Sequence, residues 1–396
     1  MNYQTIGLSH YSLYIHIPFC IHRCGYCDFN TYAGLEDLIP AYVNALIEEI
    51  HQSATSADEP LPVHTVFFGG GTPSLIPVEA VKRILVALRV AYCVSENAEI
   101  TLEANPGTLS LEKLRGLREA GINRLSFGVQ SANPEQLRLL ERQHDFEDVI
   151  QGVKWARQAG FENLNLDWIY GLPGQTLESW KGNIELAIGL QPDHLSLYAL
   201  SIEHGTPFKE MMTRGLLPVL DPDLAADMYE WASTRLGAAG YEQYEISNWA
   251  KLGAACKHNL QYWRTEPYLG LGAGAHGFAN GYRTANVLAP AAYIQRFKQG
   301  GKFQFPKTAA TIILEKIDER RAMGEMMMMG LRLVKEGVPR HSFSGRFGRG
   351  LDEVYGAQIE KLQILGLLES VNGNQNAIRL TQRGRLLGNQ VFIEFI

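Results

Sequence analysis

The first half of the chain alternates short β-branched and apolar runs with amphipathic stretches, and this rhythm limits the fold more than any other feature. The expected strands are Ser12–Ile17, His64–Phe68, Glu99–Glu103, Arg124–Val129, Asn163–Ile169 and His194–Ala199. The expected helices between them are Ala41–His51, Glu79–Val90, Leu111–Ala120, Phe146–Ala159 and Leu177–Leu190. Strand–helix units in series predict an α/β fold with a parallel sheet and right-handed crossovers. The sheet is either doubly wound or an incomplete (β/α) barrel.

The rhythm ends near residue 205. The elements expected beyond it are a helix over Asp223–Ala239, a strand over Tyr241–Ile246, helices over Ile313–Lys335 and Leu351–Leu365, and a hairpin of Leu368–Val371 and Ala377–Leu380. The region Ser247–Asn286 shows little regular period, and we interpret Met326–Met329 as flexible packing of a core helix. We therefore expect a partial barrel over 1–205, an accessory α+β region over 206–307, and a small C-terminal helical and winged domain over 308–396.

Length, charge and hydropathy exclude several classes of protein. A chain of 396 residues is longer than one compact core usually supports. The net charge of -6 argues against a nucleic-acid partner, which needs a clustered basic face. No apolar run reaches the roughly 20 residues of a membrane span. Met1–His10 lacks the pattern of a signal peptide, so we expect a cytoplasmic protein with no transmembrane segment.

Three of the five cysteines follow the first expected strand within eight residues. Cys20, Cys24 and Cys27 form a poor disulfide framework and instead indicate a metal site. Three thiolates bind three irons of a [4Fe–4S] cluster and leave the fourth iron for a chelating ligand such as S-adenosylmethionine (SAM). The alternative is a zinc site that takes His16 or His22 as its fourth ligand.

Polar or glycine residues stand at or just after the ends of the other expected strands. They are Gly69-Gly70-Gly71, Glu103, Gln130, Asp167 and Tyr198. The carboxyl ends of barrel strands converge on one mouth, whereas a doubly wound sheet concentrates its site at one switch point. The spread of these residues over successive strands therefore favours a partial (β/α)6 barrel of the TIM type.

These motifs together resemble a known family. Cys-x3-Cys-x2-Cys after YIHIPF, then GGGTP, LEANP, SFGVQ, YEISNWA and YLGLGAGAHG, resemble the radical SAM superfamily, and within it the oxygen-independent coproporphyrinogen III oxidases and their relatives. The resemblance implies that Cys20, Cys24 and Cys27 ligate the cluster. It also implies a set of SAM-binding residues, with Tyr26 covering the cluster: Tyr14, Tyr26, Gly70, Gly71, Thr72, Glu103, Gln130, Arg142 and Asp167.

Two departures point to one branch of that family. The oxidases carry a further cysteine two residues after the third, where this chain has Phe29, and they have a longer segment before the cluster. Both features resemble the HemW branch of haem chaperones, as does the segment HNLQYW at 258–263. The resemblance implies haem binding by His258, Asn259, Tyr262 and Trp263. The residues alone favour a different interpretation, an aromatic packing motif between barrel and accessory region with His258 hydrogen-bonded in the core.

The expected function is therefore that of a haem chaperone with a SAM-ligated [4Fe–4S] cluster, which passes haem to acceptor haemoproteins. The alternative is a radical SAM oxidase that decarboxylates coproporphyrinogen III. The sequence leaves open whether SAM is cleaved, which haemoprotein accepts the haem, and whether the chain forms a homodimer.

Overall fold

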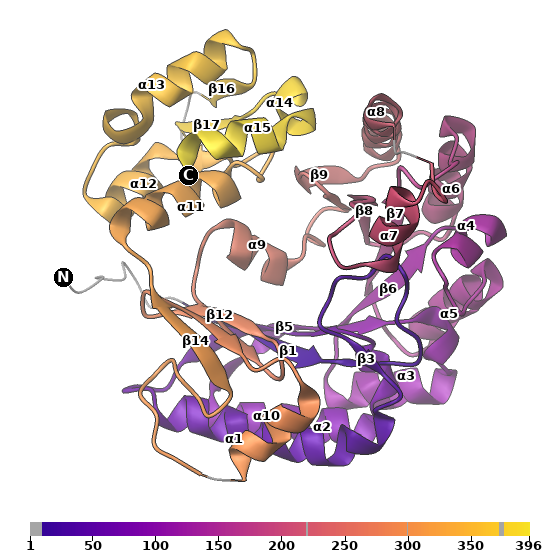
Figure 1. Cartoon of the computed structure of the whole chain (residues 1–396), viewed down its shortest axis with the longest axis vertical. Helices are drawn as coiled ribbons and strands as arrows, with labels where there is room; N and C mark the ends of the chain where they lie inside the picture. The colour runs from indigo at the N-terminus through magenta and orange to yellow at the C-terminus, as the bar shows by residue number, and fades with distance from the viewer. Residues whose placement is uncertain (1–9, 219–220, 299, 372–375) are drawn as a thin grey trace.

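Six parallel strands form the centre of one large sheet, as the sequence predicts. The computed structural model describes residues 10–218, 221–298, 300–371 and 376–396. The six strands are hydrogen-bonded in chain order: β1 (Tyr11–Ile17), β4 (Pro62–Gly70), β5 (Cys93–Ala104), β6 (Arg124–Gln130), β7 (Asn163–Tyr170) and β8 (His194–Ala199). Their parallel pairing, interrupted by register shifts at Tyr11/Ser12, Val63/Thr65 and Gly128/Gln130, gives the curved half-barrel seen in Figure 1.

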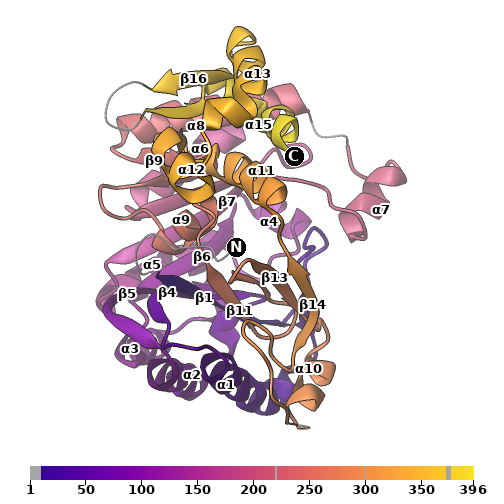
Figure 2. The ribbon, with the colours of Figure 1, turned by 90° about the vertical axis from the view of Figure 1, so that its left-hand side faces the viewer.

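Amphipathic helices cover the outer face of this sheet (Figures 1 and 2). They are α1 (Ile39–Thr55), α2 (Val78–Ala91), α3 (Leu111–Ala120), α5 (Phe146–Gln158), α6 (Leu177–Gly189) and α8 (Pro222–Ala238). Local sequence sets their ends. The Ser110 hydroxyl accepts from the Lys113 amide at the start of α3, and Gly121 ends α3 in the left-handed conformation. Asp145 and Asp148 form a capping box at the start of α5.

The sheet continues past both edges of the half-barrel. Beyond β1 lie β11 (Tyr268–Leu271), β12 (His276–Ala279), β13 (Tyr282–Asn286) and β14 (Thr311–Lys316), and beyond β8 lie β10 (Asn248–Ala250) and β9 (Glu242–Glu245). The region Ser247–Asn286 is thus more regular than its sequence suggests. Its strands have only three to five residues, too few to show a clear period.

The predicted helix Ile313–Lys335 is wrong at both ends. Residues 311–316 form the edge strand β14, which pairs with β13, and helix α11 spans Glu319–Gly330. The β-branched run Thr311-Ile312-Ile313 favours the extended strand. The side chain of Asp318 accepts from the Arg321 amide at 2.9 Å and starts the helix there.

A buried carboxylate fastens the sheet extension to α1. Glu49 accepts hydrogen bonds from the Gly272 amide, Asn286, the Tyr293 hydroxyl and Thr308, at 2.6 to 2.9 Å. Burial raises the pKa of Glu49 to about 7, while the four donors lower it. This network holds β11 to β13, together with α10 (Pro290–Phe297), in place against the barrel.

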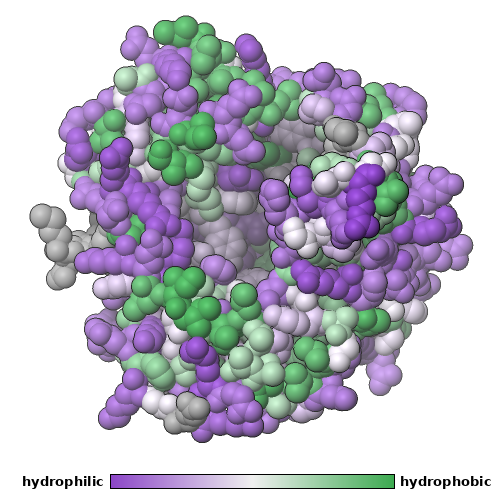
Figure 3. All heavy atoms as spheres, viewed as in Figure 1, coloured by the Kyte–Doolittle hydropathy of each residue, from purple (hydrophilic) through white to green (hydrophobic). Residues whose placement is uncertain are grey.

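The C-terminal elements pack around a hydrophobic cluster of their own. They are α11, α12 (Arg340–Phe347), α13 (Leu351–Ile364), α14 (Gln382–Leu386), α15 (Gly388–Phe392) and the small sheet β15 (Val338–Pro339), β17 (Ala377–Leu380) and β16 (Leu368–Val371). The predicted hairpin of β16 and β17 is confirmed. These elements stand across a central hollow from α7 (Pro207–Thr213) and α8 (Figures 1 and 3).

None of the helices in the described ranges is long and apolar enough to cross a membrane.

Candidate functional site

The three clustered cysteines lie on one loop at the mouth of the half-barrel. Cys20 ends the short strand β2 (Phe19–Cys20), which pairs with β3 (Tyr32–Ala33), and Cys24 and Cys27 lie on the turn between these strands. The Cys27 amide donates to the Cys24 carbonyl at 3.0 Å, which closes that turn. All three are free thiols that line a single cavity of about 400 Å³. Burial raises the pKa of the Cys20 and Cys27 thiols.

The glycine-rich turn after β4 brings the backbone against this loop. The Gly71 amide donates to the Ile17 carbonyl at 2.8 Å. A Cβ atom at Gly71 would lie 2.6 Å from the Phe19 carbonyl oxygen and 3.0 Å from the Cys20 sulfur. Gly70 has a φ of +116°, and a Cβ there would meet the His16 ring at 2.6 Å. Only glycine fits at these two positions.

Carboxylates at the ends of β5 and β7 form the floor of the cysteine cavity. Glu103 accepts from the Gly70 amide at 3.2 Å, and burial together with the charge of Asp167 raises the pKa of Glu103 to about 8. Asp167 accepts from Ser126 at 3.0 Å and from Asn165 at 2.8 Å. Burial raises the pKa of Asp167, and these donors oppose the rise.

A guanidinium and a phenol complete the wall near Cys24. Arg142 donates to the Gly128 carbonyl at 2.8 Å and lies 3.9 Å from the Cys24 sulfur, so it can stabilise a thiolate there. Its Nε atom is buried without a partner. Tyr26 packs edge-on against Phe208. Gln130 ends β6 with a φ of 67°, a conformation that costs energy for a non-glycine residue and is often found at binding sites.

The structure gathers eight of the nine predicted SAM residues around this cavity: Tyr26, Gly70, Gly71, Thr72, Glu103, Gln130, Arg142 and Asp167. Tyr14 is the exception. It lies behind the Gly69 backbone, and its hydroxyl bonds to the His16 ring at 3.1 Å. Tyr14 therefore lines the neighbouring cavity.

The zinc alternative needs His16 or His22 as its fourth ligand, and both rings are engaged in hydrogen bonds. His16 already bonds to Tyr14 and to the Asn30 carbonyl, and His22 bonds to Glu141 at 2.8 Å. Over the residues that the structure describes, no three histidine, cysteine or carboxylate side chains close on a single ion. The three thiols line one cavity. Three thiolates are the number that a [4Fe–4S] cluster with one open iron needs, whereas a structural zinc ion takes four protein ligands.

A second, larger cavity of about 800 Å³ adjoins the first. Six aromatic side chains line it: Tyr14, Phe29, Tyr262, Trp263, Tyr268 and Phe278. Its volume lies within the range of small-molecule sites. Asp28, Phe29, Gly70 and Glu103 line both cavities, so the two meet at the loop after Cys27. Phe29, where the oxidases carry a cysteine, stands at this junction and is 64% exposed.

The predicted haem segment 258–263 coincides with helix α9 (Lys257–Trp263), which lies between the half-barrel and the C-terminal elements (Figure 1). Tyr262 and Trp263 line the larger cavity, whereas His258 and Asn259 line a small pocket of about 180 Å³ behind it. His258 is 1% exposed and uses both ring nitrogens, bonding to Thr65 and Tyr262 at 2.8 Å each. Burial lowers the pKa of His258 to about 3. As an iron ligand, His258 would have to give up one of these bonds.

Several residues of the larger cavity were not predicted from the sequence. They are His276, Phe278, Arg283, Met328, Met329 and Arg346. The alternation of His276 and Phe278 on one strand face was the only local signal. The methionine run was interpreted as packing, which holds for Met327, buried in the C-terminal cluster. Met328 and Met329 face the cavity instead.

Comparisons with known proteins agree with this geometry. The model of the radical SAM superfamily matches residues 14–187, and that of the HemN C-terminal domain matches 317–387. The half-barrel and its cysteine loop thus define a radical SAM protein, a class that implies a [4Fe–4S] cluster and SAM.

Individual relatives show to which family within the radical SAM class the chain belongs. The haem chaperone HemW of Bacillus subtilis is 41% identical over 97% of this chain and 99% of its own length. HemW of Escherichia coli is 42% identical over 73% of this chain and 77% of its own. The solved coproporphyrinogen III oxidase HemN of Escherichia coli superposes with a TM-score of 0.80 at 25% identity, covering 98% of this chain and 90% of that one. The chain belongs to the HemW family.

Proposed function

We propose that this protein is a haem chaperone, which holds one haem in the larger cavity beside a SAM-ligated [4Fe–4S] cluster and passes the haem to an acceptor haemoprotein. The observation that carries the proposal is the aromatic cavity of about 800 Å³ that opens beside the cysteine loop. Flat aromatic side chains offer the apolar contact area that a porphyrin needs. The names of the HemW relatives support the same function.

The residues of the cysteine cavity fit the cluster and its SAM ligand. Cys20, Cys24 and Cys27 would hold three irons. The carboxylate of Glu103 can accept hydrogen bonds from an ammonium group or a ribose, and Arg142 can pair with a carboxylate. When bound, the cluster would supply a redox-active centre with one open iron. Gly70 and Gly71 let the turn after β4 approach the His16 ring and the cysteine loop closely, so the backbone itself lines the cavity.

In this proposal, segment 258–263 contributes the wall of the haem cavity. Tyr262 and Trp263 supply the flat surface, and His258 fixes the Tyr262 ring through the hydrogen bond of 2.8 Å. Asn259 lies behind that wall. The sequence-based expectation that His258 binds haem can be compared directly with this positioning role.

Anaerobic titration of the cluster-loaded protein with haemin tests the function. We expect saturable binding of one haem per chain and a Soret band that moves to an added apo-haemoprotein. Trp263→Ala should weaken binding, and Trp231→Ala, on α8, is the matched control. The same sample should be assayed with coproporphyrinogen III and SAM. Absence of haem binding, or protoporphyrinogen formed at catalytic turnover, would contradict the proposal and favour the oxidase.

A further inference from the structure

The sheet wall of the larger cavity presents the His276 imidazole among aromatic rings; the other histidine of the cavity, His16, uses both ring nitrogens in hydrogen bonds to Tyr14 and the Asn30 carbonyl. His276 and Phe278 stand two residues apart on β12, so their side chains share a face. Tyr268 on β11 lies opposite Phe278 in the antiparallel ladder. All three side chains line the cavity.

His276 differs from the other histidines near this cavity in its hydrogen bonding and in its exposure. His16 and His258 use both ring nitrogens in hydrogen bonds and are buried. Within the described part of the chain, the His276 side chain makes no hydrogen bond, and it is exposed to the cavity. Burial and the nearby Arg283 lower the pKa of His276, so its ring is neutral near pH 7 and has a lone pair to donate to a metal.

The opposite wall carries two thioethers. Helix α11 lies above β12 in Figure 1 and above β13 in Figure 2. Met328 and Met329 on α11 line the cavity. The helix is held against β13 by two hydrogen bonds from Arg283 to Glu325, of 2.9 and 3.1 Å. An imidazole and a thioether are thus offered by opposite walls, the pair of axial ligands that cytochromes c use for haem iron.

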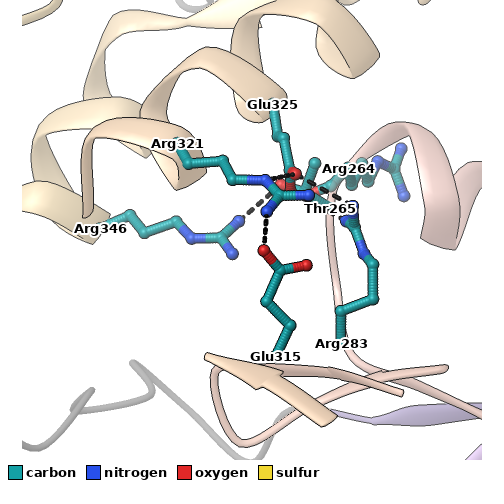
Figure 4. Close-up of polar contacts among 7 residues, drawn as sticks. All are labelled: Arg264, Thr265, Arg283, Glu315, Arg321, Glu325 and Arg346. Atoms are coloured by element: carbon teal, nitrogen blue, oxygen red, sulfur yellow. Dashed lines mark hydrogen bonds and ion pairs between the residues drawn. The ribbon is translucent and has the colours of Figure 1, made fainter. Parts of the chain in front are cut away.

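The rim of the cavity offers partners for the propionates. Arg283 and Arg346 line the cavity and form what we call the arginine rim, and Glu325 lines it beside Arg283. Figure 4 shows Arg283 bonded to Glu325, which Arg321 also contacts, and Arg346 donating to Thr265 at 2.6 Å. Arginine side chains bind carboxylates well because their donors form a planar fork. The Trp263 indole nitrogen is buried in the same wall without a hydrogen-bond partner.

We propose that His276 is an axial ligand of the haem iron from the sheet side, and that the α11 methionine pair Met328–Met329 supplies the second axial ligand. The haem then lies between β12 and α11, with its propionates toward the arginine rim. This inference rests on the proposed haem-binding function and adds to it the residues that hold the iron. It assigns His258 a positioning role through Tyr262.

Spectroscopy of the haem-loaded full-length protein tests the ligation. In the wild type we expect low-spin ferric haem with the far-red charge-transfer band of thioether ligation. His276→Ala should become high-spin, and added imidazole should restore the low-spin form. His341→Ala, on α12 away from the cavity, is the matched control. The double variant Met328→Leu/Met329→Leu should lose the far-red band and have a lower reduction potential, whereas Met326→Leu should keep both.

His258→Gln discriminates between the two histidines, because glutamine retains hydrogen-bonding capacity at a buried position. We expect its haem spectrum to stay low-spin, with circular dichroism confirming the fold of every variant. If His276→Ala keeps the wild-type spectrum while His258→Gln becomes high-spin, the ligand assignment is overturned and the chaperone function stands. If the wild type takes up no haem, the proposed function itself fails.

Discussion

The two adjoining cavities are built in different ways. The cysteine cavity is assembled from the ends of successive barrel strands, with backbone amides, carboxylates and a guanidinium in fixed hydrogen bonds. The larger cavity lies between the sheet extension and the C-terminal elements, and most of its exposed surface is apolar, although Glu266, Glu325 and Arg283 also line it. A rigid polar site suits a resident cofactor, whereas an apolar site between separately packed parts suits a cargo that must leave.

The largest expected effect is loss of the cluster from the cysteine cavity while the larger cavity still binds haem. Cys24→Ser removes one of three thiolates and should abolish assembly of the cluster, measured as bound iron and acid-labile sulfide after anaerobic reconstitution. Cys93→Ser, an exposed cysteine at the start of β5, is the control and should retain full cluster content. Haem binding should persist in both variants. Loss of haem binding together with the cluster would show that the cavities are one functional site.

A smaller effect, on the affinity for SAM, is expected from Glu103, which lines both cavities. Glu103 has a pKa raised to about 8, so it is protonated below that pH in the free protein. A bound ammonium or ribose donor favours the ionised form. SAM affinity should therefore rise as the pH increases from about 6 to about 8 and then level off.

Glu103→Gln should weaken SAM by roughly 10-fold or more, the effect of losing a charged acceptor, and should remove this pH dependence. Calorimetric titration with SAM across the pH range measures both. An unchanged pH profile in the variant would show that a different group binds SAM.

The smallest expected effect is on stability and on the rate of haem release, and it concerns the Arg283–Glu325 pair beside the larger cavity. Glu325→Gln weakens the half-buried pair with Arg283 and should lower the free energy of unfolding by only about 1 kcal/mol. Because the pair joins α11 to β13, haem should dissociate faster, measured by transfer to apo-myoglobin. Glu369→Gln breaks an ion pair within the C-terminal hairpin and serves as the control. Equal dissociation rates in the two variants would mean that α11 need not move for haem release.

The same contrast explains what the sequence could predict. The six barrel strands and the residues at their ends were found because strand, helix and polar end recur within short stretches, as in Thr101–Asn105. The edge strand β14 was missed because its apolar residues also fit a helical period. The larger cavity was missed because it joins Phe29, His276 and Met329, which are far apart in the chain and meet only in the folded sheet. His258 was expected to face a ligand, but tertiary packing buries it.

The most direct test of two adjoining sites is a haemin titration of the cluster-loaded protein saturated with SAM. Iron, sulfide and bound SAM are counted before and after each addition. We predict that one haem binds per chain while the cluster and SAM stay in full occupancy. Haem uptake that displaces SAM or the cluster in equal amount would contradict the arrangement of a cofactor cavity beside a separate haem cavity.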